Sequence, residues 1–326
     1  MENAAGALGA MALLGGAGVV LARRGLLDER GVDALKILIT RLTLPLLLFR
    51  AFLALDLGPG NLVLAGVVFA ACAAMALIGA LLVRLVRLPH PETRLLFQGF
   101  EAGMLGYALF AALHPGEHLS AFAALDLGQV VYVFTVLLAQ MTVLERHRVS
   151  ALAGERPGNP APTDGTAPGG GFPWRAIAGS TVLWAIAAGL LVSRSWPSLA
   201  GVLTAPTGPF AVVVDTVGGL TTPLVCLVIG ASLAEGIPRD RAIVTIVAAR
   251  TVVGLGFGLL VGLLVVPALG FSGWYTKAAL MLFLLPAPFV IPAYYRRNPA
   301  LVGSVLTLGT AVSIVLIAVL AVLDVV

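Results

Sequence analysis

The sequence predicts an all-α integral membrane protein, with ten transmembrane helices arranged as two inverted five-helix repeats. The first observation is composition: 59% of the 326 residues are apolar and 11% are charged, whereas soluble domains have about 25% charged residues. The second is that ten apolar segments, most long enough to span a bilayer, follow one another along the chain. The third is an internal repeat, in which residues 42–46 (LTLPL) return 178 positions later as residues 220–224 (LTTPL). An odd number of crossings in each half would invert the second half relative to the first.

The ten segments divide equally between the two halves. In the first half they are 4–22, 33–55, 61–86, 93–113 and 119–144. In the second half they are 174–193, 209–233, 240–266, 274–295 and 300–324. These boundaries predict a first repeat over residues 1–150, a flexible cytoplasmic linker over 151–172, which is rich in Gly and Pro, and a second repeat over 173–326.

Charge in the connections predicts the orientation. Connections rich in Arg alternate with connections that carry few basic residues, and the basic side of a membrane protein faces the cytoplasm. Both termini are therefore expected outside. The preference for Arg over Lys indicates a GC-rich bacterial genome, which places the chain in a bacterial inner membrane, in contact with membrane lipid.

Helices 4 and 9 are predicted to be broken. Helix 4 contains Gln98, Glu101 and Gly103 in a glycine-rich stretch, and helix 9 contains Pro286, Pro288 and Pro292. Each proline removes a backbone hydrogen bond and clashes with the preceding turn. Broken helices at matching places in two repeats indicate a solute-binding site in a transporter. The alternative is that the prolines only kink the helix for packing.

Two charged side chains, Glu101 and Arg250, are predicted to lie within the bilayer. A charge at the bilayer centre costs at least about 2.5–3.5 kcal/mol, so such residues usually face a cavity or a partner. One hypothesis is a structural ion pair between Glu101 and Arg250. The other is a binding site in which Arg250 holds an anion and Glu101 takes up a proton.

Other classes of function find little support. The sequence contains no catalytic constellation and no phosphate-binding loop, so an enzyme is not predicted. Two cysteines in separate helices and four scattered histidines predict no disulfide, no metal site and no cofactor. The net charge of +4 comes from helix ends, which makes topology a better explanation than a nucleic-acid partner.

Four stretches, taken together, resemble the auxin efflux carrier family, part of the superfamily of bile acid, auxin and arginine transporters. They are residues 21–28 (LARRGLLD), 42–49 (LTLPLLLF), 223–233 (PLVCLVIGASL) and 286–294 (PAPFVIPAY). Where family members often carry Asn beside the break in helix 4, this chain has Glu101-Ala102-Gly103.

The resemblance implies an elevator-type secondary transporter of a small organic anion, and proton coupling through Glu101 is left open. It implies a scaffold of helices 1, 2, 6 and 7, which forms a homodimer. It also implies a mobile domain of helices 3–5 and 8–10, in which helices 4 and 9 cross at the substrate. A sodium symporter of the bile-acid type and a transport-inactive sensor with the same fold remain alternatives.

Overall fold

The computed structural model describes residues 2–85, 92–114, 118–152, 179–205, 208–234, 236, 240–295 and 297–326. Every regular element in these ranges is helical. Almost all of the predicted linker, from residue 153 to 172, lies outside the described residues.

The helices of the first half coincide with the five predicted segments. They are α1 (Glu2–Arg23), then α2 (Glu29–Leu38), η1 (Ile39–Thr43) and α3 (Leu44–Leu53), then α4 (Pro59–Leu85), then α5 (Thr93–Leu96), η2 (Ala102–Gly106) and α6 (Tyr107–Leu113), then α7 (Leu119–Tyr132), η3 (Val133–Leu137) and α8 (Leu138–Leu152). The η segments are single π-helical turns, a form that often occurs at functional sites.

The second half has the same order of segments. Its elements are α10 (Thr181–Ser195), α11 (Pro197–Thr204), α12 (Pro209–Gly219), α13 (Thr221–Ala234), α14 (Arg241–Leu260), η4 (Val261–Val265), α15 (Val266–Ala268), α16 (Gly273–Leu284), α17 (Ile291–Tyr294) and α18 (Pro299–Val322). Asp28, Asp240 and Asn298 cap α2, α14 and α18 by accepting a hydrogen bond from a backbone N–H of the first turn, which satisfies a donor that the helix leaves free.

One helix was not predicted. Residues 194–208 were expected to be a connection, but α11 occupies part of it and makes an angle of 120° with α10. Pro197 stands at the first position of α11, where its missing N–H costs nothing and its fixed backbone angle favours a new helix. Apolar composition alone could not separate this short helix from the loop.

Within the described residues, five helices are long and apolar enough to cross a membrane, or six if α10 and α11 count as one bent span. The five are Pro59–Leu85, Leu119–Glu145, Pro209–Ala234, Arg241–Ala268 and Pro299–Val322. Their length and composition indicate a membrane-embedded protein.

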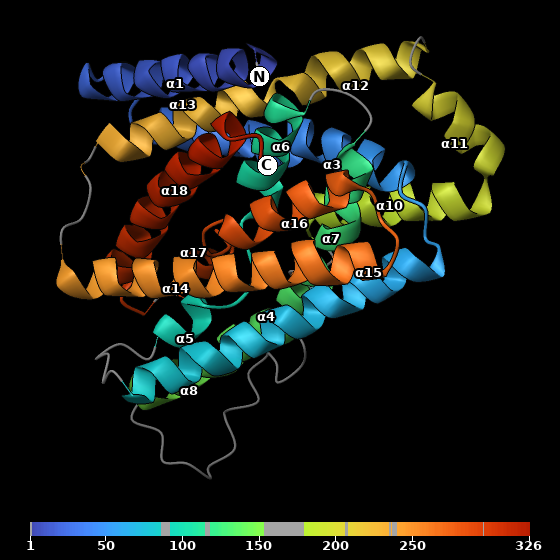
Figure 1. Ribbon diagram of the computed structural model, residues 1–326. Helices are drawn as coiled ribbons and strands as arrows, with labels where there is room; N and C mark the ends of the chain where they lie inside the picture. Colours follow the sequence, from blue (N-terminus) through green and yellow to red (C-terminus); the bar gives the residue numbers. More distant parts are fainter. Residues whose placement is uncertain are drawn as a thin grey trace, which may run out of the picture.

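The largest helix contacts fall into two groups. In the first group, α1 lies along α13 and α10 lies along α3 (Figure 1). Glycine makes the first of these contacts possible, because a Cβ on Gly230 would lie 2.0 Å from the carbonyl oxygen of Gly15. The close backbone approach is typical of helix pairs in membranes.

The second group contains α4, α7, α14, α16 and α18. In it, α4 packs on α7, and α14 packs on both α16 and α18. A Cβ on Gly254 would lie 2.3 Å from the carbonyl oxygen of Phe283, and Gly258 and Gly262 also face α16. This face of α14 therefore serves helix packing.

Candidate functional site

The two predicted breaks are present and touch each other. The first lies between the end of α5 at Leu96 and the start of η2 at Ala102, and the second between the end of α16 at Leu284 and the start of α17 at Ile291. Across them, the Glu101 N–H donates to the carbonyl oxygen of Pro286 at 2.9 Å. The Phe289 N–H donates to Glu101 Oε2 at 2.5 Å. The interruptions of the two helices therefore form one bonded unit.

Glu101 is the side chain that both breaks share. Its Oε1 accepts from the N–H of Met104 at 3.1 Å, which makes it the N-cap of η2, while Oε2 holds Phe289. A carboxylate at the start of η2 accepts from backbone N–H groups that have no partner within a helix, and its negative charge is favourable at the positive end of the helix. The side chain is 7% exposed, and that exposed part faces the cavity described below.

Arg250 supports the first break and does not pair with Glu101. Its guanidinium donates to the carbonyl oxygens of Leu96 at 2.6 Å and Gly99 at 2.5 Å. Its Cζ lies 5.4 Å from the centre of the Phe100 ring. The hypothesis of a Glu101–Arg250 ion pair is therefore wrong. The guanidinium instead donates to carbonyl groups that lose their helical N–H partners where helix 4 is broken.

Gln98 also acts within the protein rather than toward a cavity. Its Nε2 donates to the Arg94 carbonyl at 3.0 Å and to Gln140 Oε1 at 2.9 Å, and its Oε1 accepts from the Tyr132 hydroxyl at 2.9 Å. Gln98 thus connects the end of α5 to the helix that contains α7, η3 and α8. Like Arg250 and Pro286, it does not line the main cavity.

A second amide, Gln129 on α7, bonds to the backbone of the break. Its Nε2 donates to the Phe100 carbonyl at 3.2 Å and its Oε1 accepts from the Phe100 N–H at 3.2 Å. Nε2 also donates to Asp126 Oδ1 at 3.0 Å. Gln129 therefore replaces the hydrogen bonds that Phe100 would make in a continuous helix.

Asp126 lies deep in the protein. Its side chain is 2% exposed and accepts from Tyr107 Oη at 3.1 Å as well as from Gln129. Asp126 and Gln129 are three residues apart, which places them on one face of the helix, but the sequence does not show that this face meets the break.

A cavity of about 670 Å³ lies beside the joined breaks, within the range of small-molecule sites. Of the predicted site residues, Glu101, Gly103, Pro288 and Pro292 line it. We use the name floor for five buried residues of the lining, namely Phe100, Glu101, Asp126, Gln129 and Thr310. The sequence did not indicate Thr310 as a site residue.

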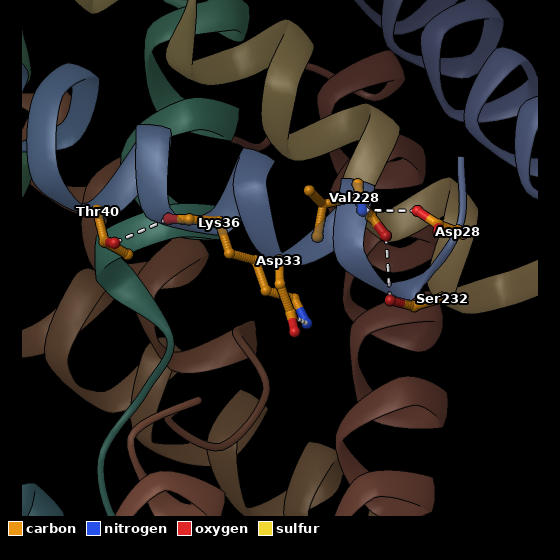
Figure 2. A network of polar contacts seen from close by, with 7 residues as sticks. Asp28, Asp33, Lys36, Thr40, Val228 and Ser232 are labelled. Atoms are coloured by element: carbon orange, nitrogen blue, oxygen red, sulfur yellow. Dashed lines mark hydrogen bonds and ion pairs between the residues drawn. The ribbon is translucent and has the colours of Figure 1, made fainter. Parts of the chain in front are cut away.

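The mouth of the cavity lies among the end of α2, η1, the beginning of α10 and the end of α13. Lys36, Thr40, Arg41, Thr181 and Ser232 line it. Figure 2 shows Lys36 bonded to Asp33, at 3.3 Å, and Thr40 and Ser232 bonded to carbonyls of their own helices. Because Lys36, Thr40 and Ser232 already have partners, we interpret the mouth as a polar entrance to the cavity and not as the solute-binding site.

Among the described residues, no group of three or more His, Cys, Asp or Glu side chains is arranged to hold a metal ion. The floor instead combines two carboxyl groups, an amide, a hydroxyl and an aromatic ring.

Comparison of the chain with models of known protein families and with curated protein sequences gave no match.

Proposed function

We propose that this chain is a secondary-active transporter in which the two groups of helices move relative to each other and carry the cavity floor across the membrane. The observation that carries the proposal is the bonded pair of breaks, joined through Glu101, at the floor of a 670 Å³ cavity. Discontinuous helices that line a cavity at membrane depth are the build of secondary transporters.

Packing between helices supports an inverted repeat of ten helices. If the two halves are equivalent, helix 1 corresponds to helix 6 and helix 2 to helix 7. Two contacts are then equivalent: α1 packs on α13, which joins helices 1 and 7, and α10 packs on α3, which joins helices 6 and 2. The contact of α4 with α7 likewise has the contact of α14 with α18 as its equivalent. Two halves related by such a symmetry axis would alternate access by rocking or sliding of one group.

The two groups of helices correspond to the proposed scaffold and mobile domain. The scaffold is α1, α3, α10 and α13 with their flanking helices, and the mobile domain contains both breaks. Residues from both groups line the cavity, for example Leu48 and Ile229 on one side and Phe100 and Thr310 on the other. A cavity between a fixed and a moving group is what an elevator mechanism requires.

The mouth indicates the inward-facing state. Lys36, Arg41 and Thr181 lie at the ends of helices 2 and 6 that the basic connections assign to the cytoplasm. In this proposal both termini lie outside, in a bacterial inner membrane, and the cavity as described is open to the cytoplasm.

The experiment is a transport assay on the purified full-length chain in liposomes on a solid support, with a panel of small organic solutes at two pH values, with and without sodium. The expected result is a solute-dependent current that Glu101→Gln abolishes. The two oxygens of Glu101 accept separately from the Met104 and Phe289 amides, and in Gln one of these oxygens is replaced by an NH2 group, which can only donate. The matched control is Asp33→Asn, at an exposed carboxyl beside the mouth, which should retain the current.

Two outcomes would contradict the proposal. One is equal currents from Glu101→Gln and the unchanged protein. The other is the absence of both current and radiolabelled counterflow for every solute that binds the protein. A current that requires sodium would support the sodium-symporter alternative for the coupling ion.

A further inference from the structure

The floor of the cavity contains two acidic side chains. The charged side chains that line it are Glu101 and Asp126, which are 7% and 2% exposed. Arg250, the cation expected to hold an anionic solute, is bonded to the carbonyls of Leu96 and Gly99 and does not line the cavity. An anion at the floor would therefore meet two carboxyl groups, because the described cationic side chains of the lining, Lys36 and Arg41, belong to the mouth.

The backbone donors of the breaks are also occupied. In broken-helix transporters, the free amides at half-helix N-termini commonly hold the anionic group of the solute. Here the amides of Met104 and Phe289 already bond to the carboxylate of Glu101. The protein thus supplies its own anion at the place where an anionic solute would otherwise bind.

The cations at the mouth do not reverse this pattern. Lys36 and Arg41 are exposed, and Lys36 already pairs with Asp33. Water and salt screen exposed charges of this kind. Their position at the basic end of helix 2 is also explained by membrane orientation, whereas Glu101 and Asp126 are buried beside the cavity.

Thr310 provides a second, independent observation. Its side chain is 4% exposed and lines the same cavity, and its hydroxyl has no hydrogen-bond partner among the described residues. Buried hydroxyls normally have partners, and Thr310 has the only buried hydroxyl without one among the described residues that line this cavity. A donor on a bound solute would satisfy it. A hydroxyl and two carboxyl groups can all accept, and an ammonium group has three donors and no acceptor.

The rest of the lining indicates an organic cation rather than a bare ion. Phe100, Phe134 and Phe289 present aromatic rings to the cavity, and Leu44, Met104 and Ile229 present aliphatic groups. Aromatic faces attract ammonium groups, and an apolar wall stabilises a hydrocarbon portion by excluding it from water. A volume of about 670 Å³ far exceeds what one metal ion needs.

We propose that the solute of this cavity is a small organic cation, a protonated amine with an apolar portion, whose ammonium group binds Asp126, Glu101 and the hydroxyl of Thr310. This assignment rests on the proposed transport function for its biological meaning. It replaces the organic anion that the sequence favoured.

Binding to the full-length protein in detergent tests the assignment. The probes are three molecules of similar shape: 2-phenylethylamine, the carboxylate 3-phenylpropanoate and the neutral 2-phenylethanol, each measured by calorimetry and by thermal shift. The expected result is binding of the amine at least tenfold tighter than of the other two probes. Asp126→Asn should weaken the amine at least tenfold and Thr310→Val severalfold, while Asp33→Asn should leave its affinity unchanged.

Specific results would overturn the inference. Preferred binding of the carboxylate would do so, as would an amine affinity that neither Asp126→Asn nor Thr310→Val changes. Thr310→Val keeps the test valid if Asp126→Asn does not fold, because it changes neither volume nor charge much. Stabilisation by sodium alone, without any effect of the amine, would also overturn it and assign the carboxyl groups to ion coupling.

Flux measurements separate this inference from the proposed function. If the amine binds but does not move across liposomes, the assignment of the cavity stands and the transport proposal fails. If 3-phenylpropanoate moves and the amine does not, transport stands and the charge assigned to the solute is wrong.

Discussion

The two breaks solve the same problem in different ways. The first, between α5 and η2, is built around Gly99 with a positive φ of 66°, and its freed carbonyls need Arg250 and Gln129 from other helices. The second, between α16 and α17, contains Pro286 and Pro288, which have no N–H to satisfy. Its freed carbonyls bond to Ser313 and to the backbone of Glu101. A break made with proline needs less outside support than a break made with glycine.

The arms of the two broken helices also differ in length. In the first, a four-residue arm (α5) precedes the break and twelve residues of η2 and α6 follow it. In the second, the twelve-residue arm (α16) precedes the break and the four-residue arm (α17) follows it. The two short arms meet, because Glu92 before α5 accepts from the hydroxyl of Tyr295 at 3.2 Å and pairs with Arg297 at 3.1 Å.

The largest effect is expected at the support of the first break. Arg250→Ala leaves the Leu96 and Gly99 carbonyls without their donors in a buried place, which should lower the free energy of unfolding by about 3 kcal/mol or more. Thermal unfolding in detergent measures the loss. The stability of Arg250→Lys should lie between that of Arg250→Ala and that of the unchanged protein, because a single ammonium group replaces the forked guanidinium that reaches both carbonyls. An unchanged melting temperature in Arg250→Ala would show that the first break does not depend on Arg250.

A smaller effect is expected from Gly99→Ala. The left-handed backbone costs a residue with a Cβ about 1–2 kcal/mol, and this Cβ would lie 2.6 Å from Val133 Cγ2 and 2.9 Å from Pro288 Cγ. Both breaks should therefore be displaced, and transport should fall together with thermal stability. The control is Gly256→Ala in α14, where a Cβ meets nothing within 4 Å, and which should be as stable as the unchanged protein or more stable.

The smallest effect is expected at the second break. Ser313→Ala removes the hydrogen bond of 2.6 Å to the Leu284 carbonyl and should cost about 1 kcal/mol. Ser232→Ala, whose hydroxyl only bonds a carbonyl of its own helix, should not change the unfolding midpoint. If Ser313→Ala proved as damaging as Arg250→Ala, the proposed difference between the two breaks would be wrong.

The sequence revealed the features that depend on local chemistry. Pro286 and Pro288 interrupt any helix, so the second break could be predicted, and the glycines and Glu101 marked the first. Features that depend on long-range packing could not be predicted. Arg250 bonds to carbonyls about 150 residues away in the chain, and nothing local distinguishes that role from an ion pair.

Asp126 and Thr310 show the same limit in the site itself. Each lies in an apolar helix, and whether its side chain faces lipid, a neighbouring helix or a cavity depends on how that helix is rotated about its axis. A helix with apolar residues on every side gives no periodic signal of that rotation. The charge of the floor, and with it the charge of the proposed solute, became visible only once the helices were packed.

The unequal arms have an electrical consequence for the proposed transporter. In the proposed inward-facing state, water in the open cavity would bring the cytoplasmic potential as far as the floor, and the membrane voltage would then fall mainly across the twelve-residue arms. A helix of that length spans about 18 Å, well under the thickness of the bilayer. A charge moving from the floor to the far side would therefore gain or lose nearly the full 2.3 kcal/mol or so per 100 mV over that short distance.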